Sequence, residues 1–239
     1  MDKRNGIDKE LFSYKILKDK KRIAGEKATE YIKDGMILGL GTGSTAYYMI
    51  KRVGDLVQDG MKLKAVATSK FTEDLANELK IPLISIDKVD TIDLCIDGVD
   101  EIDSKFNAIK GGGGALFREK VVANLAKEVI WIMDESKLVD KIGSFPLPVE
   151  ILPYGYTQII KKLDEYSLNP IIRIKDNKIF ITDNGNYIVD LHVGKSKDIM
   201  YVYNKVMRIT GVLEVGLFSD ICKRIIVGTD YGAKIIENK

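Results

Sequence analysis

The stretch IDLCIDGVDEIDSKFNAIKGGGGALFREK, residues 92–120, joins an apolar segment to carboxylates, a lysine and four consecutive glycines. The apolar segment, residues 92–96, predicts a strand, and two carboxylates, Asp97 and Asp100, follow it on a tight turn. The glycines, residues 111–114, cost backbone entropy on folding, which another interaction must offset. We interpret the stretch as a site that binds a small polar ligand and moves protons. A calcium-like acidic loop or a solvated turn is the alternative interpretation.

The helix predicted over residues 115–128 places Glu119 on an apolar face. At roughly 100° per residue, the polar face and the neighbours of Glu119 separate clearly. The polar face consists of Lys120, Asn124, Lys127 and Glu128, and Glu119 falls among Ala115, Leu116, Ala123 and Ala126. A carboxylate in such surroundings should be partly desolvated, which raises its pKa towards neutrality, as a general base requires. A structural ion pair of Glu119 with Arg118 or Lys120 is the alternative.

Strands and helices alternate on both sides of this stretch. Strands are predicted at residues 36–40, 63–69, 81–86, 91–96 and 128–137, and helices at residues 8–33, within 41–57, at 71–79 and at 115–128. This alternation predicts a parallel sheet with helices on both faces. In such sheets ligands bind beyond the carboxyl ends of the strands, where the turn after residue 96 is expected to lie.

The sequence GTGST, residues 41–45, connects a predicted strand to a predicted helix. A helix N-terminus offers unpaired N–H groups that suit a phosphate, and Thr42, Ser44 and Thr45 add hydroxyl donors beside Gly43. The loop lacks the Gly-Lys-Ser/Thr ending of a Walker loop. Ser44 stands where the dinucleotide fingerprint requires its third glycine, which argues against a nicotinamide cofactor. A plain strand–helix turn with Ser and Thr caps is the alternative.

The strand predicted at residues 128–137 ends in Asp134 and Lys137, near the same edge of the sheet. Lys137 is either a ligand contact or an ordinary surface lysine.

Prolines at positions 146, 148 and 153 indicate the passage into a second, α+β unit. Its predicted elements are a helix at 156–166, a hairpin of 170–174 with 178–183 around Asp176-Asn177, a strand at 187–193 and a helix at 197–209. Residues 212–218 and 222–236 have strand character and are expected to rejoin the first sheet. His192 lies within the strand at 187–193 and is expected to be structural.

Composition limits the classes of function. With 239 residues, 45% hydrophobic and 30% charged, the chain is expected to form one large or two small globular domains. The net charge of +2 gives no electrostatic case for a nucleic-acid partner. No segment is apolar enough for a signal peptide or a membrane span.

Cys95 and Cys222 lie in apolar segments, which predicts buried thiols and a reducing compartment, most simply the cytosol. One histidine and two distant thiols predict no Cys/His metal site.

Four stretches together resemble the signature stretches of type A ribose-5-phosphate isomerase, in that family's order. They are GLGTGSTA (39–46), DGVDEID (97–103), KGGGGALFREK (110–120) and DESK (134–137), and TGVLEVGLF (210–218) resembles a later pattern of the family. The resemblance runs through essentially the whole chain apart from a short N-terminal extension. It implies a doubly wound, mostly parallel, Rossmann-like α/β domain, residues 1–146 plus 212–239, with a smaller ferredoxin-like α+β domain inserted at residues 147–211.

The resemblance also implies the activity. The family interconverts D-ribose 5-phosphate and D-ribulose 5-phosphate, a step of the pentose phosphate pathway, without metal or organic cofactor. Its members are typically homodimers or homotetramers. Glu119 matches the family's base, Lys110 matches the cation near the enediolate oxygen, and Asp97 and Asp100 match carboxylates that bind sugar hydroxyls and assist ring opening. Substrate binding is further expected from Thr42, Gly43, Ser44, Thr45, Gly98, Val99, Gly111, Gly112, Gly113 and Lys137, with residues 42–45 and Lys137 assigned to the phosphate.

Two other classes remain open from the sequence. A non-catalytic sugar-phosphate sensor would need an output module, for which the first 34 residues are too short, and it would not need Glu119. A neighbouring enzyme is the other class. An amino-sugar phosphate deaminase is expected to use a catalytic histidine, and His192 is far in sequence from the glycines. A CoA transferase uses a glutamate nucleophile, so Glu119 alone does not exclude it.

Overall fold

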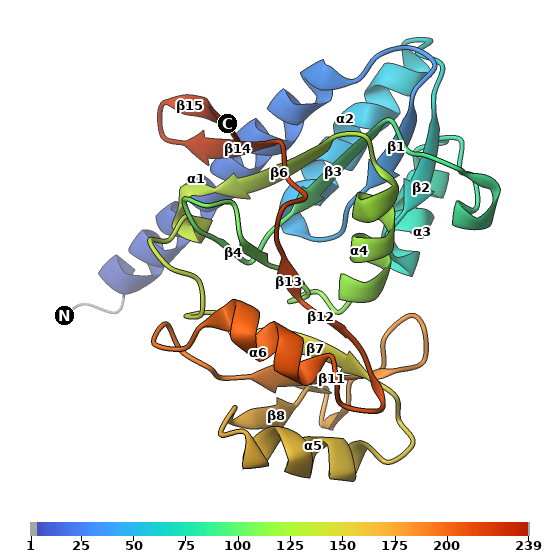
Figure 1. Cartoon of the computed structure of the whole chain (residues 1–239). Helices are drawn as coiled ribbons and strands as arrows, with labels where there is room; N and C mark the ends of the chain where they lie inside the picture. The colour runs from blue at the N-terminus through green and yellow to red at the C-terminus, as the bar shows by residue number, and fades with distance from the viewer. Residues whose placement is uncertain (1–3, 239) are drawn as a thin grey trace.

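The computed structural model describes residues 4–238, with side chains described from residue 15 onward. A six-stranded sheet of order β15-β14-β6-β3-β1-β2 forms the larger part of the molecule (Figure 1). Its strands are β1 (Ile37–Leu40), β2 (Lys64–Ala67), β3 (Leu94–Gly98), β6 (Val129–Asp134), β14 (Arg224–Thr229) and β15 (Gly232–Glu237). β15 pairs antiparallel with β14, and the other neighbours are parallel. The predicted mostly parallel sheet is therefore confirmed.

Helices cover both faces of this sheet, as predicted. They are α1 (Arg4–Ala28), α2 (Ser44–Gln58), α3 (Lys70–Glu78) and α4 (Leu116–Leu125). Side chains alternate along a strand, so β3 serves two cores. Leu94 and Ile96 pack with residues of α1, α2 and α3, whereas Cys95 packs with Val122 of α4 on the opposite face. Asp97, the last residue but one of the strand, follows the same alternation and lies on the α4 side.

The smaller part of the molecule is an antiparallel sheet of order β12-β7-β11-β8, drawn in the lower half of Figure 1. Its strands are β7 (Leu147–Ile151), β8 (Pro170–Ile172), β11 (Tyr187–Leu191) and β12 (Val212–Val215), and its helices are α5 (Tyr156–Glu165) and α6 (Ile199–Val206). The chain order β-α-β-β-α-β is that of a ferredoxin-like unit. A core of its own, with Val149, Leu163 and Val206 at its centre, holds this sheet to its helices.

Short elements complete the chain. A three-stranded sheet of order β13-β5-β4 contains β4 (Glu101–Ile102), β5 (Ala108–Ile109) and β13 (Leu217–Phe218). A two-stranded ribbon contains β9 (Ile174–Lys175) and β10 (Lys178–Ile179). Single turns of 3-10 helix are η1 (Thr29–Tyr31), η2 (Ile86–Lys88) and η3 (Glu135–Lys137).

Three predicted elements were wrong. Residues 81–86 form no strand, because only one bridge, Ala65 to Leu83, pairs them before η2 begins. In the predicted hairpin, β9 and β10 pair around the turn, but β8 pairs with β11 instead. Residues 212–218 do not rejoin the first sheet, because β12 pairs with β7 and β13 pairs with β5. The domain boundaries stay a prediction, and the pairing of β12 places Val212–Val215 in the smaller sheet.

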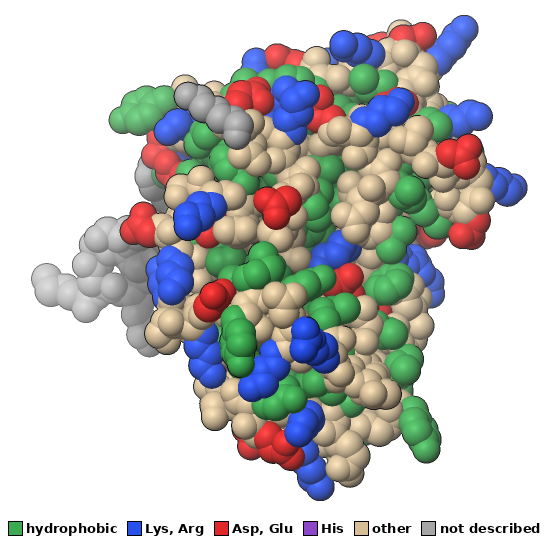
Figure 2. All heavy atoms as spheres, viewed as in Figure 1, with side chains coloured by type: hydrophobic (Ala, Val, Ile, Leu, Met, Phe, Trp, Pro, Cys, Tyr) green, Lys and Arg blue, Asp and Glu red, His purple; other side chains and the backbone are tan. Residues whose placement is uncertain are grey.

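The thiols, the helices and the surface charges can be compared with what the composition predicted. Cys95 and Cys222 are buried free thiols, as predicted. Within residues 4–238 no helix is long and apolar enough to cross a bilayer. Figure 2 shows acidic and basic side chains interspersed over the face drawn, consistent with the net charge of +2. The N-terminal extension falls mostly outside the residues whose side chains are described.

Candidate active site

The loops that follow β1, β3 and β6 meet the glycine loop, residues 111–114, around a cavity of about 110 Å³. The cavity lies beyond the carboxyl ends of the parallel strands, where α/β sheets bind ligands. Its lining consists of Lys21, Thr42, Gly43, Ser44, Thr45, Gly98, Val99, Asp100, Lys110, Gly111, Gly113, Glu119 and Lys137. The structure thus brings together around the cavity all residues predicted for the site except Asp97, which contacts Lys110, and Gly112, which bonds Asp100. Lys21 was not predicted.

Asp97 is fully buried at the end of β3. Its Oδ1 accepts hydrogen bonds from the backbone N–H groups of Thr42 at 2.9 Å and Gly98 at 2.7 Å. A Cβ atom on Gly41 would lie 2.1 Å from this oxygen, so only glycine leaves room for the carboxylate. Burial raises the pKa of Asp97, while Lys110 and the two backbone donors oppose the rise.

Lys110 lies between two carboxylates and is almost completely buried. Its Nζ is 3.0 Å from Asp97 Oδ2 and 3.6 Å from Glu119 Oε2, and it donates a hydrogen bond to the carbonyl of Gly98. The ring of Trp131 lies 4.9 Å from the ammonium. Burial lowers the pKa of Lys110, but the charges of Asp97 and Glu119 outweigh burial and the pKa is raised overall. The lysine therefore stays charged inside the protein.

Glu119 lies in the first turn of α4 and is 4% exposed. Its Oε2 accepts no hydrogen bond from the described residues, and its nearest cation is Lys110. Burial raises the pKa of Glu119 to about 8, with Lys110 opposing and Asp97 adding to the rise. The predicted desolvated carboxylate is therefore present.

The alternative ion pairs of Glu119 do not form. Arg118 bonds Asn184 instead, and Lys120 bonds Glu214 at 2.7 Å. The assignment of Lys120 to a solvated helix face was wrong, because β12 covers this side of α4 and leaves Lys120 only 7% exposed.

Asp100 connects the turn after β3 to the glycine loop. Its Oδ2 accepts a hydrogen bond from the N–H of Gly112 at 2.7 Å. The next acidic residues serve the fold instead: Glu101 accepts a bond from the N–H of Gly143, and Asp103 accepts one from the N–H of Asn107. Of the four carboxylates in residues 97–103, only that of Asp100 lines the cavity.

The opposite end of the cavity has the properties of an anion site. Gly43 is the N-cap of α2 and has no side chain to bond the first-turn amides, which leaves them open to a ligand. Lys21 of α1 donates to Ser44 Oγ at 2.9 Å. Lys137 of η3 lines the cavity without a hydrogen bond or ion pair to the described residues. Sequence could not identify Lys21, because no motif shows that α1 passes beside the GTGST loop.

Thr42 differs from its neighbours in this loop. Its N–H bonds Asp97, and its hydroxyl lies 2.7 Å from Thr68 Oγ1 and 2.8 Å from Ser69 Oγ. Both donors of Thr42 are therefore engaged within the protein, and Ser44 and Thr45, which also line the cavity, are the hydroxyl side chains of this loop that remain available to a ligand.

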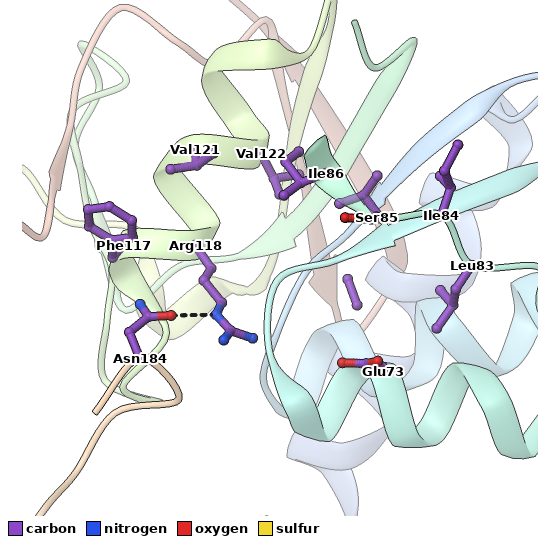
Figure 3. Close-up of a pocket in the computed structure, with 12 residues that line it drawn as sticks. Glu73, Leu83, Ile84, Ser85, Ile86, Phe117, Arg118, Val121, Val122 and Asn184 are labelled. Carbon is purple, nitrogen blue, oxygen red and sulfur yellow. Dashed lines mark hydrogen bonds between the residues drawn. The ribbon is translucent and has the colours of Figure 1, made fainter. Parts of the chain in front are cut away.

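A larger cavity, about 630 Å³, lies on the far side of α4 and is drawn in Figure 3. Phe117, Arg118, Val121 and Val122 of α4 form one wall, and Arg118 points towards Asn184. None of the residues predicted for the site lines this cavity. Within residues 4–238, no group of three or more His, Cys, Asp or Glu side chains could hold a metal ion.

A buried carboxylate with a raised pKa, a buried lysine and open helix amides in an α/β fold are the features expected of an enzyme that acts on a small anionic ligand. A family model described as ribose 5-phosphate isomerase A (phosphoriboisomerase A) matches residues 64–232. The ribose-5-phosphate isomerase A of Streptococcus pneumoniae (strain Hungary19A-6) is 46% identical over 220 residues, 92% of this chain and 97% of that protein.

Solved structures agree with the sequence relatives. A ribose 5-phosphate isomerase from Plasmodium falciparum superposes with a TM-score of 0.87 at 39% identity, covering 92% of this chain and 98% of its own. A D-ribose-5-phosphate isomerase in complex with phospho-erythronic acid gives a TM-score of 0.86 at 40% identity, covering 91% and 97%. The chain therefore belongs to the ribose 5-phosphate isomerase A family, and it is an aldose–ketose isomerase.

Proposed function

We propose that the protein interconverts D-ribose 5-phosphate and D-ribulose 5-phosphate through a cis-enediolate, with Glu119 as the proton-transferring base. The observation that carries this proposal is the buried Glu119 carboxylate, whose pKa of about 8 suits proton transfer near neutral pH. The names of the sequence relatives point to the same substrate. The phospho-erythronic acid held by one solved relative, a phosphorylated sugar acid, supports a phosphosugar in this cavity.

The substrate's phosphate is assigned to the start of α2. Open first-turn amides and the positive end of the helix dipole favour an anion there. Lys21 and Lys137 add two ammonium groups to the same end of the cavity. The sugar chain then extends from Ser44 and Thr45 towards Lys110 and Glu119.

In this orientation Glu119 removes the proton from C2 of the open-chain aldose. The electrons of the C–H bond form the C1=C2 double bond, and the carbonyl oxygen O1 takes the negative charge. Lys110 and the N–H of Gly113 stabilise this oxyanion. A proton then moves from O2 to O1, and Glu119 returns its proton to C1, which gives the ketose. One carboxylate therefore serves both carbon atoms.

The two aspartates have different surroundings, which supports different roles. Asp100 lines the cavity, and we assign to it the sugar hydroxyls and the proton transfers between oxygens. Asp97 is fully buried and already contacts two amides and Lys110. These contacts support a role in holding Lys110 in place and offer less support for the predicted contact with a sugar hydroxyl.

The proposal is tested by converting ribose 5-phosphate to ketose with purified protein in EDTA. Glu119→Gln should lose turnover by roughly a hundred- to ten-thousand-fold, because the amide cannot accept the proton. Ribose 5-phosphate should still raise the melting temperature of this variant.

Glu128→Gln is the control. It makes the same change on a side chain that bonds Lys223 and Arg224 outside the cavity, and it should keep full activity. A fully active Glu119→Gln would remove Glu119 from the mechanism, and activity only with added metal would contradict the metal-free reaction.

We also propose that the protein works as a homodimer or homotetramer in the cytosol. The family resemblance supports the oligomer, and the two buried thiols support a reducing compartment. Sedimentation of the purified protein tests the oligomeric state, since a monomer at assay concentration would contradict it.

A further inference from the structure

One segment of the smaller sheet reaches across to the glycine loop. Arg173, between β8 and β9, donates from Nη1 to the carbonyls of Gly111 at 2.7 Å and Gly112 at 3.2 Å. Phe180 packs against Gly114, where an added Cβ atom would lie 2.4 Å from the ring. The glycine loop is thus covered by side chains from a part of the chain that contributes nothing to the cavity lining.

The guanidinium of Arg173 is held in a fixed orientation. Asp190 on the neighbouring strand β11 accepts from Nε at 2.9 Å and also from Nη2, a two-point contact that sets the plane of the group. The ring of Phe180 lies 6.0 Å from the guanidinium carbon. The guanidinium therefore presents Nη1 to the two glycine carbonyls in one geometry.

The contact with two carbonyls also determines where two amides point. In a trans peptide unit the C=O and the N–H point in opposite directions, and the described chain contains no cis peptide bond. With the Gly111 carbonyl facing Arg173, the Gly112 N–H faces away and bonds Asp100 at 2.7 Å. With the Gly112 carbonyl facing Arg173, the Gly113 N–H also faces away from Arg173, and Gly113 lines the cavity.

We propose that Arg173 is a positioning residue for the isomerase reaction. Held by Asp190, it fixes the peptide units of the glycine loop so that the Gly112 N–H holds Asp100 and the Gly113 N–H faces the developing oxyanion. This inference rests on the proposed enediolate mechanism. A donor that acts on the oxyanion matters more in the transition state than in the bound substrate, so Arg173 should affect kcat more than KM.

The chain offers a matched control for the loss of an arginine at the junction of the two sheets. Arg118 of α4 donates to Asn184 Oδ1 at 2.8 Å, the bond drawn in Figure 3, and to the carbonyl of Asp183 at 3.2 Å. Asp183 and Asn184 belong to the smaller part, as Arg173 does. The hydrogen bonds of the Arg118 side chain go to Asp183 and Asn184 and not to the glycine loop, so Arg118→Ala weakens the junction without releasing the loop.

Steady-state kinetics on ribose 5-phosphate with Arg173→Ala, Asp190→Asn and Arg118→Ala test the proposal. Arg173→Ala should lower kcat by roughly ten- to hundred-fold, less than the loss of an oxyanion donor itself, with KM within about threefold of the wild type. Asp190→Asn keeps the size of the side chain and frees the guanidinium, so kcat should fall by a smaller factor. Arg118→Ala should keep the wild-type kcat.

Chemical rescue separates positioning from a general loss of structure. Free guanidinium ion, well below concentrations that unfold proteins, should restore part of kcat in Arg173→Ala and none in Arg118→Ala. The inference is overturned if Arg173→Ala keeps kcat within about twofold of the wild type, if Arg118→Ala loses as much, or if guanidinium restores nothing. Wild-type turnover of ribose 5-phosphate and its loss in Glu119→Gln, measured in the same assay, report separately on the proposed function.

Discussion

At the scale of single residues, the ionisation of Glu119 should control the pH dependence of the reaction. Its pKa of about 8 lies above the ordinary 4.5, because burial disfavours the charged form. A general base works only when it is ionised, so kcat/KM should rise with pH and level off above about 8, the pKa of the free enzyme. The measurement is kcat/KM from about pH 6 to about pH 9.5. A flat profile across this range would mean that Glu119 is not the group that takes the proton.

The buried charges around Lys110 give a second prediction at this scale. Lys110→Met leaves Asp97 and Glu119 buried without their cation, which should destabilise the protein by about 3–5 kcal/mol. Asp97→Asn removes the carboxylate that lies closer to the lysine, so the double variant should be destabilised by less than the sum of the single variants. Urea unfolding of the four proteins measures this coupling. Strictly additive losses would show that the 3.0 Å contact between Lys110 and Asp97 contributes no coupling energy.

At the scale of elements, a cluster of hydroxyls connects α3 to the GTGST loop. Thr72 Oγ1 donates to the carbonyl of Gly41 at 2.8 Å and lies 3.2 Å from Thr42 Oγ1. Thr72→Val removes this donor at constant shape and leaves a buried carbonyl unpaired, at a cost of about 1–3 kcal/mol. Because the loop is proposed to bind the phosphate, KM for ribose 5-phosphate should rise several-fold.

Thr29→Val is the control for this change. Thr29 is also buried and its hydroxyl donates to the carbonyl of Glu26 at 2.7 Å, within the N-terminal helical segment. Its substitution should cost comparable stability in urea unfolding and leave KM unchanged. Equal KM values for the two variants would indicate that the hydroxyl cluster does not organise the loop.

The same elements show what sequence alone can predict. The helices were predicted from their apolar periodicity and the loop of Ser44 from its glycines, because both signals are local in the sequence. The turn at Asp176 and Asn177 was also local, and both residues adopt the positive φ that such turns need. The partner of β8 was wrong, because strand pairing depends on β11, which lies far along the chain. The strand predicted at residues 81–86 was wrong for the same reason. The apolar pattern does not show whether a neighbouring strand is available for pairing.

The residues of the candidate site also differ in whether a local sequence signal identifies them. Glu119, Lys110 and Asp100 were found because they lie in one short stretch whose residue types carry the chemistry. Lys21 and Arg173 approach that stretch from distant elements and belong to no motif, so only the folded chain shows them beside the cavity and the glycine loop. Sequence reasoning therefore finds the groups proposed to react more readily than the groups proposed to orient them.

At the scale of the whole molecule, the two sheets are joined by polar contacts on both sides of the glycine loop. Arg173 bonds the loop from the smaller sheet, and Arg118 bonds Asn184 across the junction. Lys120 of α4 is buried there, donating to Glu214 Oε1 and to the carbonyl of Val215 in β12. Since Glu119 precedes Lys120 on the same helix, a contact that fixes α4 against β12 also fixes the proposed base.

Lys120→Met should therefore uncouple the unfolding of the two sheets. The substitution leaves Glu214, only 17% exposed, without its cation, so the smaller sheet should lose stability first. Hydrogen exchange at increasing urea concentrations measures this, because cooperative units lose protection together. In the wild type, β7, β11 and β12 should lose protection with β1 and β3, and in Lys120→Met they should lose it at lower urea. Lys127→Met, which removes an exposed pair with Asp93 just beyond the end of the same helix, should behave as the wild type. Simultaneous loss of protection in Lys120→Met would show that the remaining contacts suffice to make the molecule a single cooperative unit.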